Sequence, residues 1–273
     1  MEQTTPVTSP GMPLRPRSYK TEAIVLRSLD VREADRLITA LTPSRGKLLF
    51  TVRGARRITS RLGGHVDVLN RASLGLAQGH RYDVVTGAES LESFGGIKGD
   101  LQRLASAFYL LELTDALLPE ASPHPVAYEL LLSALRALDK CESSMAVRYA
   151  ELRLLEDSGY LPELQRCLVC DTEVLPDKHR FAPLLGGVIC DRCAVSQGTV
   201  MPLSLDALKV LRFFAREDWP AVQRLRIAPA LGVELETILA TAIHHVLDHE
   251  LGAADFIEHL RRLRVRAGGA PSP

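Results

Sequence analysis

The sequence predicts an α+β protein with several domains, in which a small β-barrel precedes a helical bundle that carries an inserted four-cysteine module. Between residues 19 and 95, short β-rich runs are separated by Gly, Pro, Asp and Ser. After residue 95, apolar residues recur at steps of three and four, the period of an amphipathic helix. Two Cys-x2-Cys pairs then interrupt the helical pattern. With 273 residues, 46% of them hydrophobic, the chain can form two or three domains with a true core.

The first domain is expected at residues 19–95. Its β-rich runs cover residues 19–26, 37–42, 47–52, 66–76 and 82–88. The third run alternates, with Leu48, Phe50 and Val52 on one face and Lys47, Thr51 and Arg53 on the other. Five short strands with one buried face each suggest a closed barrel, and an OB-fold is the common solution of this size. From the pattern alone, an SH3-like barrel remains an alternative.

The helical domain is expected at residues 96–162 and 200–266. Helices are predicted at 101–118, 126–138, 145–158, 204–215, 233–251 and 254–265. Gly159 is placed to end the third of these helices, and Ser204 to cap the fourth. Polar, Pro- and Gly-rich composition predicts disordered tails at residues 1–18 and 267–273.

The four cysteines of the inserted module, residues 163–199, form two matched pairs. Cys167 and Cys170 are followed, after 19 residues, by Cys190 and Cys193. Two such knuckles supply four thiolates to a tetrahedral metal, most often zinc, and leave no open coordination position, so the expected role is structural. Disulfides, an accidental spacing and rubredoxin-type iron are the alternatives.

The remaining features favour a cytoplasmic protein. Cys141 has no partner nearby and is expected to be a half-buried hydrophobe. Residues 1–13 lack the apolar segment of a secretory signal, and no run of 18 apolar residues predicts a membrane span. Reduced, metal-binding cysteines fit the same compartment.

The charge of the chain is unevenly distributed. The formal net charge is zero, but residues 14–66 hold 12 Lys and Arg against four acids, 12 − 4 = +8. A basic module on a neutral chain suggests contact with a polyanion, and forked Arg donors suit phosphates. The predicted DNA-binding residues are Lys47, Arg53, Arg56, Arg57 and Arg61, with Arg36 and Arg45 as weaker candidates.

The other residue clusters are weaker indications of function. Aromatic residues are scarce in the barrel region, so binding through the backbone phosphates, of single and double strands alike, is favoured over base stacking. His244, His245 and His249 on one helix are better explained by a polar helix face than by a second metal site. Arg261, Arg262, Arg264 and Arg266 complement a helix C-terminus or form a second anion-binding patch. No Walker A sequence or hydrolase motif is present, and no catalytic residues are expected.

Several motifs in this order resemble the RecO family of bacterial recombination mediators. They are KTEAIVL at 20–26, EADRL at 33–37, TPSRGK at 42–47, RGARR at 53–57 with Ser60, AFYLLEL at 107–113 and ELRLLEDSGY at 151–160. The four cysteines are similar to those of the zinc-bearing members. The resemblance covers residues from about 19 to about 263.

The resemblance implies a DNA-binding OB-fold, a central helical domain and a zinc finger. It also implies annealing of complementary strands without ATP, and a partnership with RecR that helps to load RecA onto DNA coated by single-strand-binding protein. Two other classes stay open: a zinc-ribbon transcription regulator that uses the finger on DNA, and a helical scaffold that binds no DNA. The finger leans acidic, which argues against the first of these.

Overall fold

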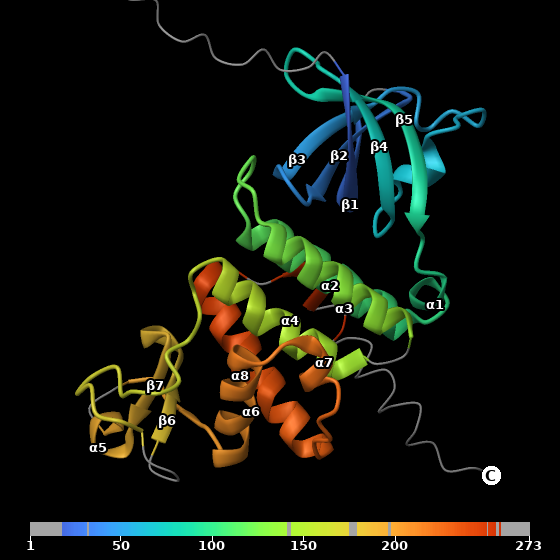
Figure 1. Ribbon diagram of the computed structural model, residues 1–273. Coiled ribbons are helices and arrows are strands. Elements are labelled where there is room, and N and C mark those ends of the chain that lie inside the picture. Colours follow the sequence, from blue (N-terminus) through green and yellow to red (C-terminus); the bar gives the residue numbers. More distant parts are fainter. Residues whose placement is uncertain are drawn as a thin grey trace, which may run out of the picture.

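The computed structural model describes residues 18–31, 33–140, 143–174, 179–195, 198–249, 251–254 and 257. Its parts are arranged in a row, with a β-barrel at one end, helices in the middle and the cysteine-rich finger at the other end (Figure 1). The predicted helix at 254–265 lies almost wholly outside the described residues, as do Cys141 and the four arginines between residues 261 and 266.

Five strands close the barrel in the order β1-β2-β3-β5-β4. They are β1 (Ser18–Val31), β2 (Asp35–Thr42), β3 (Gly46–Val52), β4 (Arg71–Ala77) and β5 (Asp83–Glu92). β3 and β5 pair in parallel and all the other neighbours antiparallel. β1 is long enough to pair with β4 through its first half and with β2 through its second. This closure confirms the predicted OB-fold.

The predicted strand at 66–76 is shorter than expected. Residues Gly63–Val66 form a 3-10 helix, η1, and β4 begins only at Arg71. Between them the chain turns: the Asn70 amide donates to the Asp67 carbonyl at 3.1 Å, and Leu69 has a φ of 81°. The apolar residues Val66 and Leu69 are buried by this turn rather than by strand pairing, and a strand pattern based on hydrophobicity does not separate the two cases.

Within the described residues, the helical part contains two short helices and five longer ones with defined bounds. They are α1 (Gly95–Lys98), α2 (Leu101–Leu117), α3 (Pro125–Asp139), α4 (Ser143–Asp157), α6 (Leu205–Arg216), α7 (Trp219–Val222) and α8 (Pro229–Leu247). Ser204 caps α6 as predicted, accepting from the Ala207 amide at 3.1 Å. α8 starts earlier than expected, with Pro229 as its first residue, and it ends earlier because Asp248 takes a left-handed φ of 56°.

Among the described helices, α8 is long and apolar enough by composition to cross a membrane. Its apolar residues Leu235, Ile238, Leu239 and Ala242 are buried in a core that also contains side chains of α4, α6 and the finger. Burial in this core accounts for these four residues, whereas Val233 on the same helix is 63% exposed.

The barrel and the helices share one continuous hydrophobic core. Ile24, Leu26 and Leu41 on the outside of the barrel pack in the same cluster as side chains of α2, α3 and α4. The turn between β2 and β3 also meets the connection between α2 and α3. A Cβ on Gly46 would lie 1.7 Å from the Ser122 carbonyl oxygen, and the φ of Gly46 is 70°, so this contact requires glycine.

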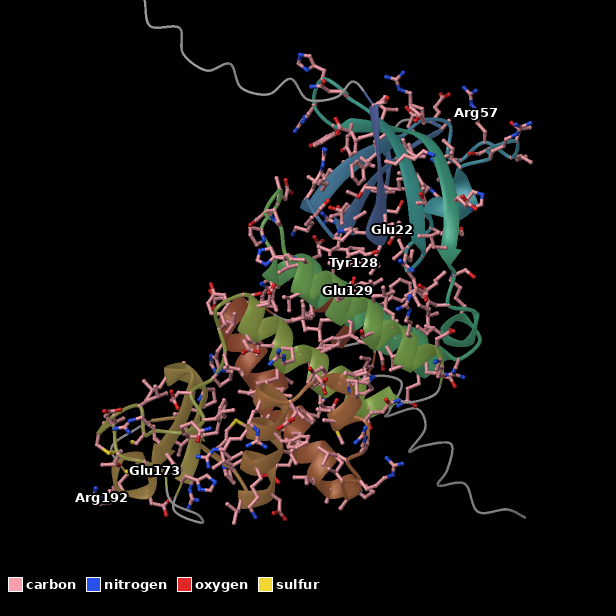
Figure 2. All side chains as sticks on the ribbon, in the orientation of Figure 1. Glu22, Arg57, Tyr128, Glu129, Glu173 and Arg192 are labelled. Atoms are coloured by element: carbon pink, nitrogen blue, oxygen red, sulfur yellow. The ribbon has the colours of Figure 1, made fainter. Side chains whose placement is uncertain are left out.

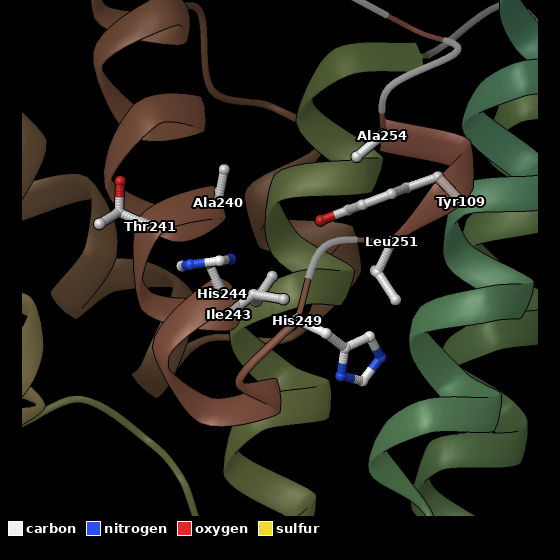
Figure 3. A pocket seen from close by; sticks show the side chains of 8 residues that line it. All are labelled: Tyr109, Ala240, Thr241, Ile243, His244, His249, Leu251 and Ala254. Carbon is white, nitrogen blue, oxygen red and sulfur yellow. The ribbon is translucent and has the colours of Figure 1, made fainter.

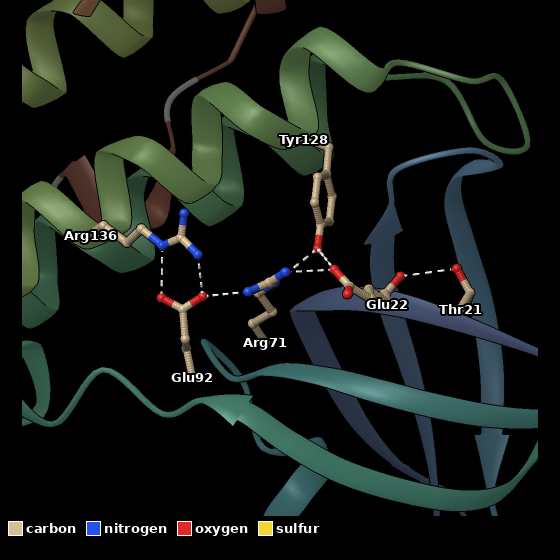
Figure 4. Close-up of polar contacts among 6 residues, drawn as sticks. All are labelled: Thr21, Glu22, Arg71, Glu92, Tyr128 and Arg136. Atoms are coloured by element: carbon tan, nitrogen blue, oxygen red, sulfur yellow. Dashed lines mark hydrogen bonds and ion pairs between the residues drawn. The ribbon is translucent and has the colours of Figure 1, made fainter. Parts of the chain in front are cut away.

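A polar network closes the same interface at its edge (Figure 4). Arg71 on β4 donates to Glu92 at 2.5 Å and to Glu22 at 2.6 Å, and its Nε approaches the hydroxyl of Tyr128 on α3 at 3.3 Å. Arg136 on α3 holds Glu92 through two bonds of 2.7 and 2.8 Å. Hydrogen bonds from Arg136, followed by those from Arg71, lower the pKa of Glu92. The network therefore fixes the orientation of the barrel on α3.

A buried carboxyl group lies in the middle of the helices. Glu151 on α4 is fully buried, accepts a 2.7 Å hydrogen bond from the Tyr109 hydroxyl, and has its other oxygen 3.0 Å from Arg148 Nε. Burial raises the pKa of Glu151 to about 7. The folded protein therefore holds this proton over a pH range in which the unfolded chain has released it.

We expect Glu151→Gln to flatten the dependence of stability on pH. The raised pKa favours folding fully below about pH 4.5, and this contribution is lost as the pH rises through about 7. Between about pH 5.5 and 8 the wild type should lose about 2 kcal/mol of unfolding free energy relative to the variant. Urea denaturation at both pH values measures this, with the partly exposed Glu156→Gln on the same helix as the control. If the unfolding free energy changes equally between the two pH values in wild type and in Glu151→Gln, the prediction is wrong.

Candidate nucleic-acid interface and metal centre

The cysteine-rich finger is a small sheet flanked by two knuckles. β6 (His179–Ala182) lies between β7 (Gly187–Cys190) and β8 (Met201–Pro202), and α5 (Asp191–Ala194) follows β7. In the first knuckle the chain turns tightly, since the Asp171 amide donates to the Cys167 carbonyl at 2.8 Å and Asp171 has a φ of 56°. These turns bring both members of each cysteine pair to one point.

The four sulfur atoms lie within 4.8 Å of one another. Cys170 Sγ and Cys190 Sγ are 3.8 Å apart, and the Cys190 amide donates to Cys167 Sγ at 3.3 Å. Four sulfurs at a Zn–S distance of about 2.3 Å in a tetrahedron are about 3.8 Å apart. None of the four cysteines is joined to another in a disulfide, which argues against the disulfide alternative. The donor set therefore fits a tetrahedral metal ion.

The thiols already differ in acidity. Hydrogen bonds from Thr172 lower the pKa of Cys170 to about 6. Hydrogen bonding with Cys190 raises the pKa of Cys193 to about 12. Thiolates are the ligand form, and a cation placed among the four sulfurs would favour deprotonation of all of them.

The finger packs closely against the helices. Cys167, Val174, Phe181 and Ile189 are buried in one cluster with residues of α4, α6 and α8. Arg212 on α6 also donates to the Leu164 carbonyl at 2.8 Å. The four-cysteine cluster therefore lies at the edge of the helical core.

No other group of His, Cys, Asp or Glu among the described residues is arranged to hold a metal ion. The rings of His244 and His245 meet edge to face with centroids 5.6 Å apart, and His249 bonds to the Leu247 carbonyl. Near them is a cavity of about 330 Å³ between α2 and α8 (Figure 3). It is lined by Tyr109, Ala240, Thr241, Ile243, His244, His249, Leu251 and Ala254. This mostly apolar lining offers no carboxylate or amine to a ligand.

The exposed arginines gather on the loop between β3 and η1. Arg53, Arg57 and Arg61 are exposed, and no ion pair within the described part of the chain engages their guanidinium groups. Arg56 is exposed as well but lies 3.4 Å from an Asp30 oxygen. In Figure 2, Arg57 projects from the side of the barrel that is remote from α2 and α3. Four of the predicted DNA-binding residues are thus brought together.

Lys47 and Arg36 do not join this group. Lys47 is only 8% exposed: its ammonium group donates to the Asp115 carbonyl of α2 and lies 3.0 Å from the Asp115 carboxylate. Arg36 is paired with Asp67 at 2.9 Å and with Asp30 at 3.4 Å. Both cations are committed within the fold, Lys47 to the contact between barrel and helices and Arg36 to the barrel surface.

Arg45 belongs to a second exposed basic area. Its guanidinium carbon lies 3.9 Å above the ring of Tyr19, whose hydroxyl donates to Asp83 at 2.6 Å. Burial, followed by the bond to Asp83, raises the pKa of Tyr19 to about 12. Arg81 and Tyr82 directly precede Asp83 in the connection between β4 and β5, and Arg81 stacks on Tyr82 at 5.1 Å.

The sequence reasoning missed Arg81. It lies outside the basic segment that ends at residue 66, and its link to Arg45 runs through Tyr19, whose ring stacks on Arg45 and whose hydroxyl donates to Asp83, two residues after Arg81. A signal was available, since Gln78–Gly79–His80 marks a loop between two strands, and this loop of an OB-fold commonly contacts oligonucleotides.

Together, the fold and the site define a modular protein of the OB-fold class. A barrel with an exposed arginine loop is joined through a shared core to helices, and these pack against a finger whose four clustered cysteines are arranged as for a metal ion. Barrels of this class commonly bind oligonucleotides through their loops and the face of strands 2 and 3.

Comparison with known proteins identifies the family. Residues 16–94 match the family described as "Recombination protein O N terminal", and residues 98–254 match "Recombination protein O C terminal". The chain belongs to the recombination protein O (RecO) family, as the sequence motifs indicated.

Curated relatives cover nearly the whole chain. The "DNA repair protein RecO" of Roseiflexus sp. (strain RS-1) is 36% identical over 92% of this chain and 88% of its own length. Those of Dehalococcoides mccartyi (strain ATCC BAA-2266 / KCTC 15142 / 195) and Desulforudis audaxviator (strain MP104C) are 37% and 39% identical. They match over 92% and 89% of this chain, and over 99% and 98% of their own lengths.

Proposed function

We propose that this protein acts in DNA repair and recombination by binding single- and double-stranded DNA and annealing complementary strands without ATP. The observation that carries the proposal is the cluster of exposed arginines, Arg53, Arg57 and Arg61, which lack ion-pair partners in the described structure. Arginines already paired with carboxylates must lose that partner before they bind a phosphate, whereas these three pay no such cost. Arg56 adds to this loop, and Arg45 and Arg81 place further exposed positive charge on the β2–β3 turn and on the β4–β5 connection.

Annealing requires that two polyanions be held side by side. Each cation that binds a phosphate displaces a condensed counterion and reduces the repulsion between the strands. A surface that contacts phosphates rather than base edges accepts any sequence and both single and double strands. Base pairing then supplies the driving force, and no nucleotide hydrolysis is needed.

The four cysteines are proposed to hold a structural zinc ion. Four thiolates at tetrahedral spacing suit zinc better than a hard cation, and a closed site leaves no position for a substrate. When bound, the ion would cross-link the two knuckles. We assign it no part in a reaction, and we propose that the protein is not an enzyme.

The family resemblance supports a proposal for the partners, the compartment and the domain bounds of this protein. The protein would work with RecR to load RecA onto DNA coated by single-strand-binding protein, in the cytoplasm. The proposed domains are the barrel at 19–95, the helical domain at 96–162 and 200–266, and the finger at 163–199.

The zinc-ribbon regulator is the weaker candidate. Arg166, the basic residue just before the first knuckle, is held by Asp171 at 2.7 Å, and Arg180 lies 3.6 Å from Asp191. Both of these cations are already engaged by carboxylates, which leaves Arg192 as an exposed arginine of the finger against three or more on the barrel loop.

We expect the purified chain to anneal complementary oligonucleotides with no ATP, and we expect the rate to fall as salt rises. Affinities for single and double strands should be of similar order, because phosphates carry the binding energy. Fluorescence anisotropy over a salt series and annealing of labelled strands measure both. A strict ATP requirement would refute the mechanism, and failure to bind either DNA at low salt would favour the scaffold alternative.

A further inference from the structure

One apolar side chain stands alone at the tip of the arginine loop. Ile58 is 105% exposed, more than any other large hydrophobic residue described. It is flanked by the exposed Arg57 and Thr59, and Arg53 and Arg61 lie on the same loop. A single exposed apolar residue is ordinary on a protein surface. The full exposure of Ile58 in the middle of a cationic loop depends on how the backbone of the loop is held.

The base of the loop is fixed on the barrel. The Gly54 amide donates to Asp35 Oδ1 at 2.8 Å, and the Arg56 amide to the Ala34 carbonyl at 3.0 Å. Ala55 between them is buried in the core of the barrel. The two ends of the loop also touch, because a Cβ on Gly63 would lie 2.5 Å from the Ala55 carbonyl oxygen.

The tip of the loop is closed by turns. The Arg57 amide donates to the Gly54 carbonyl at 3.1 Å, and the Ser60 amide to the Arg57 carbonyl at 2.8 Å. Ser60 Oγ then accepts from the amides of Leu62 and Gly63. Ile58 therefore cannot fold back onto the barrel without breaking these bonds, and its exposure is imposed by the backbone.

We propose that Ile58 is a base-contacting wedge, which packs against or between unstacked bases of DNA while the neighbouring arginines hold the phosphates. The inference rests on the proposed DNA-binding function and adds to it the one apolar contact that the loop can offer. Apolar side chains of this kind are inserted at base steps by many proteins that hold DNA through its backbone.

The charges around Ile58 favour DNA as the occupant. A basic loop with an apolar tip also suits an anionic membrane surface. However, exposed positive charge is found at more than one place on the barrel, since Arg45 precedes β3 at the end opposite the arginine loop and Arg81 precedes β5, and an extended polyanion can contact several such places. The loop should lose little conformational entropy on binding, because its turns are already formed.

The wedge also bears on annealing. Bases that contact Ile58 are held apart from their neighbours, with their pairing edges free for the complementary strand. The contact is independent of sequence, since every base has an apolar face. Its loss should slow annealing more than it weakens binding.

The test compares Ile58→Ser with Ile58→Leu, using single-stranded oligonucleotides that contain 2-aminopurine, whose fluorescence rises when it unstacks. Ile58→Ser should weaken binding about fivefold, abolish most of the fluorescence rise, and leave the salt dependence of the affinity unchanged. Ile58→Leu should behave like wild type. Val233→Ser, at a 63% exposed apolar residue on α8, is the matched control.

Unchanged affinity and fluorescence in Ile58→Ser would overturn the wedge, as would a changed salt dependence, which would mean displaced arginines. Binding to phosphatidylserine vesicles that depends on Ile58, with normal DNA binding, would assign the tip to a membrane instead. The double variant Arg53→Glu with Arg57→Glu tests the proposed DNA contact separately from the wedge. If that double variant binds DNA normally, the arginine loop is not the DNA contact and the wedge fails with it, whatever Ile58 does.

Discussion

Loss of the metal ion is expected to unfold more of this protein than the finger. Cys170→Ser should release the ion and lower the free energy of unfolding by several kcal/mol, part of the roughly 10–16 kcal/mol by which zinc stabilises isolated fingers. Cys170 is exposed, so its replacement tests the thiolate rather than the packing. Since finger and helices share one cluster, amides of α6 near Leu208 and Leu211 should exchange with solvent faster as well.

Metal analysis, thermal unfolding and hydrogen exchange measure these effects. Val169→Ser is the matched control, because Val169 lies in the same knuckle and is exposed but is no ligand. Freshly purified protein without zinc would contradict the assignment. Protection of α6 that is unchanged in Cys170→Ser would show that the finger and the helices fold independently.

Charge reversal on the arginine loop is expected to remove most of the affinity for DNA. Arg53→Glu with Arg57→Glu deletes two phosphate contacts and adds repulsion, which should weaken binding about 100-fold at about 0.1 M salt. The slope of log affinity against log salt should fall by about 1.5 to 2 units. Weakening should be similar for all sequences, because phosphates carry no sequence information.

The control must change the net charge equally. Lys209→Glu with Arg216→Glu does so on α6, where these side chains are 63% and 74% exposed. If both double variants lose affinity to the same extent, the effect is one of overall charge, and the loop is not the contact. If neither does, the arginines beyond residue 260 become the next candidates.

The local pattern of the sequence predicted the strands well and their surroundings less well. Alternation at 47–52 correctly placed Phe50 and Val52 in the core of the barrel and Lys47 on its outside. What alternation cannot tell is that α2 covers the outside at that point. Asp115, which engages Lys47, lies 68 residues further along the chain. The same limit hid the pairing of Arg36, whose partner Asp67 lies 31 residues away.

The metal ligands could be predicted because their arrangement depends on local sequence and not on distant partners. A knuckle is set by residues within a single turn, and its two cysteines converge whatever the rest of the chain does. The approach of the two knuckles depends on bonds between them: the Leu168 amide donates to the Val188 carbonyl at 3.1 Å, and the Cys190 amide donates to Cys167 Sγ at 3.3 Å. The exposure of Ile58 needed the structure, because it depends on Ala55 being anchored in the core of the barrel.

The core shared by barrel and helices has a consequence for dissecting this protein. A fragment cut after residue 94 would leave Ile24, Leu26 and Leu41 bare on the outside of its sheet, and the complementary fragment would expose the apolar side of α2 and α3. Freed surfaces of this kind promote self-association, and a sticky, aggregating barrel can retain nucleic acid nonspecifically. Point substitutions in the intact chain are therefore the sounder route to its surfaces than truncation.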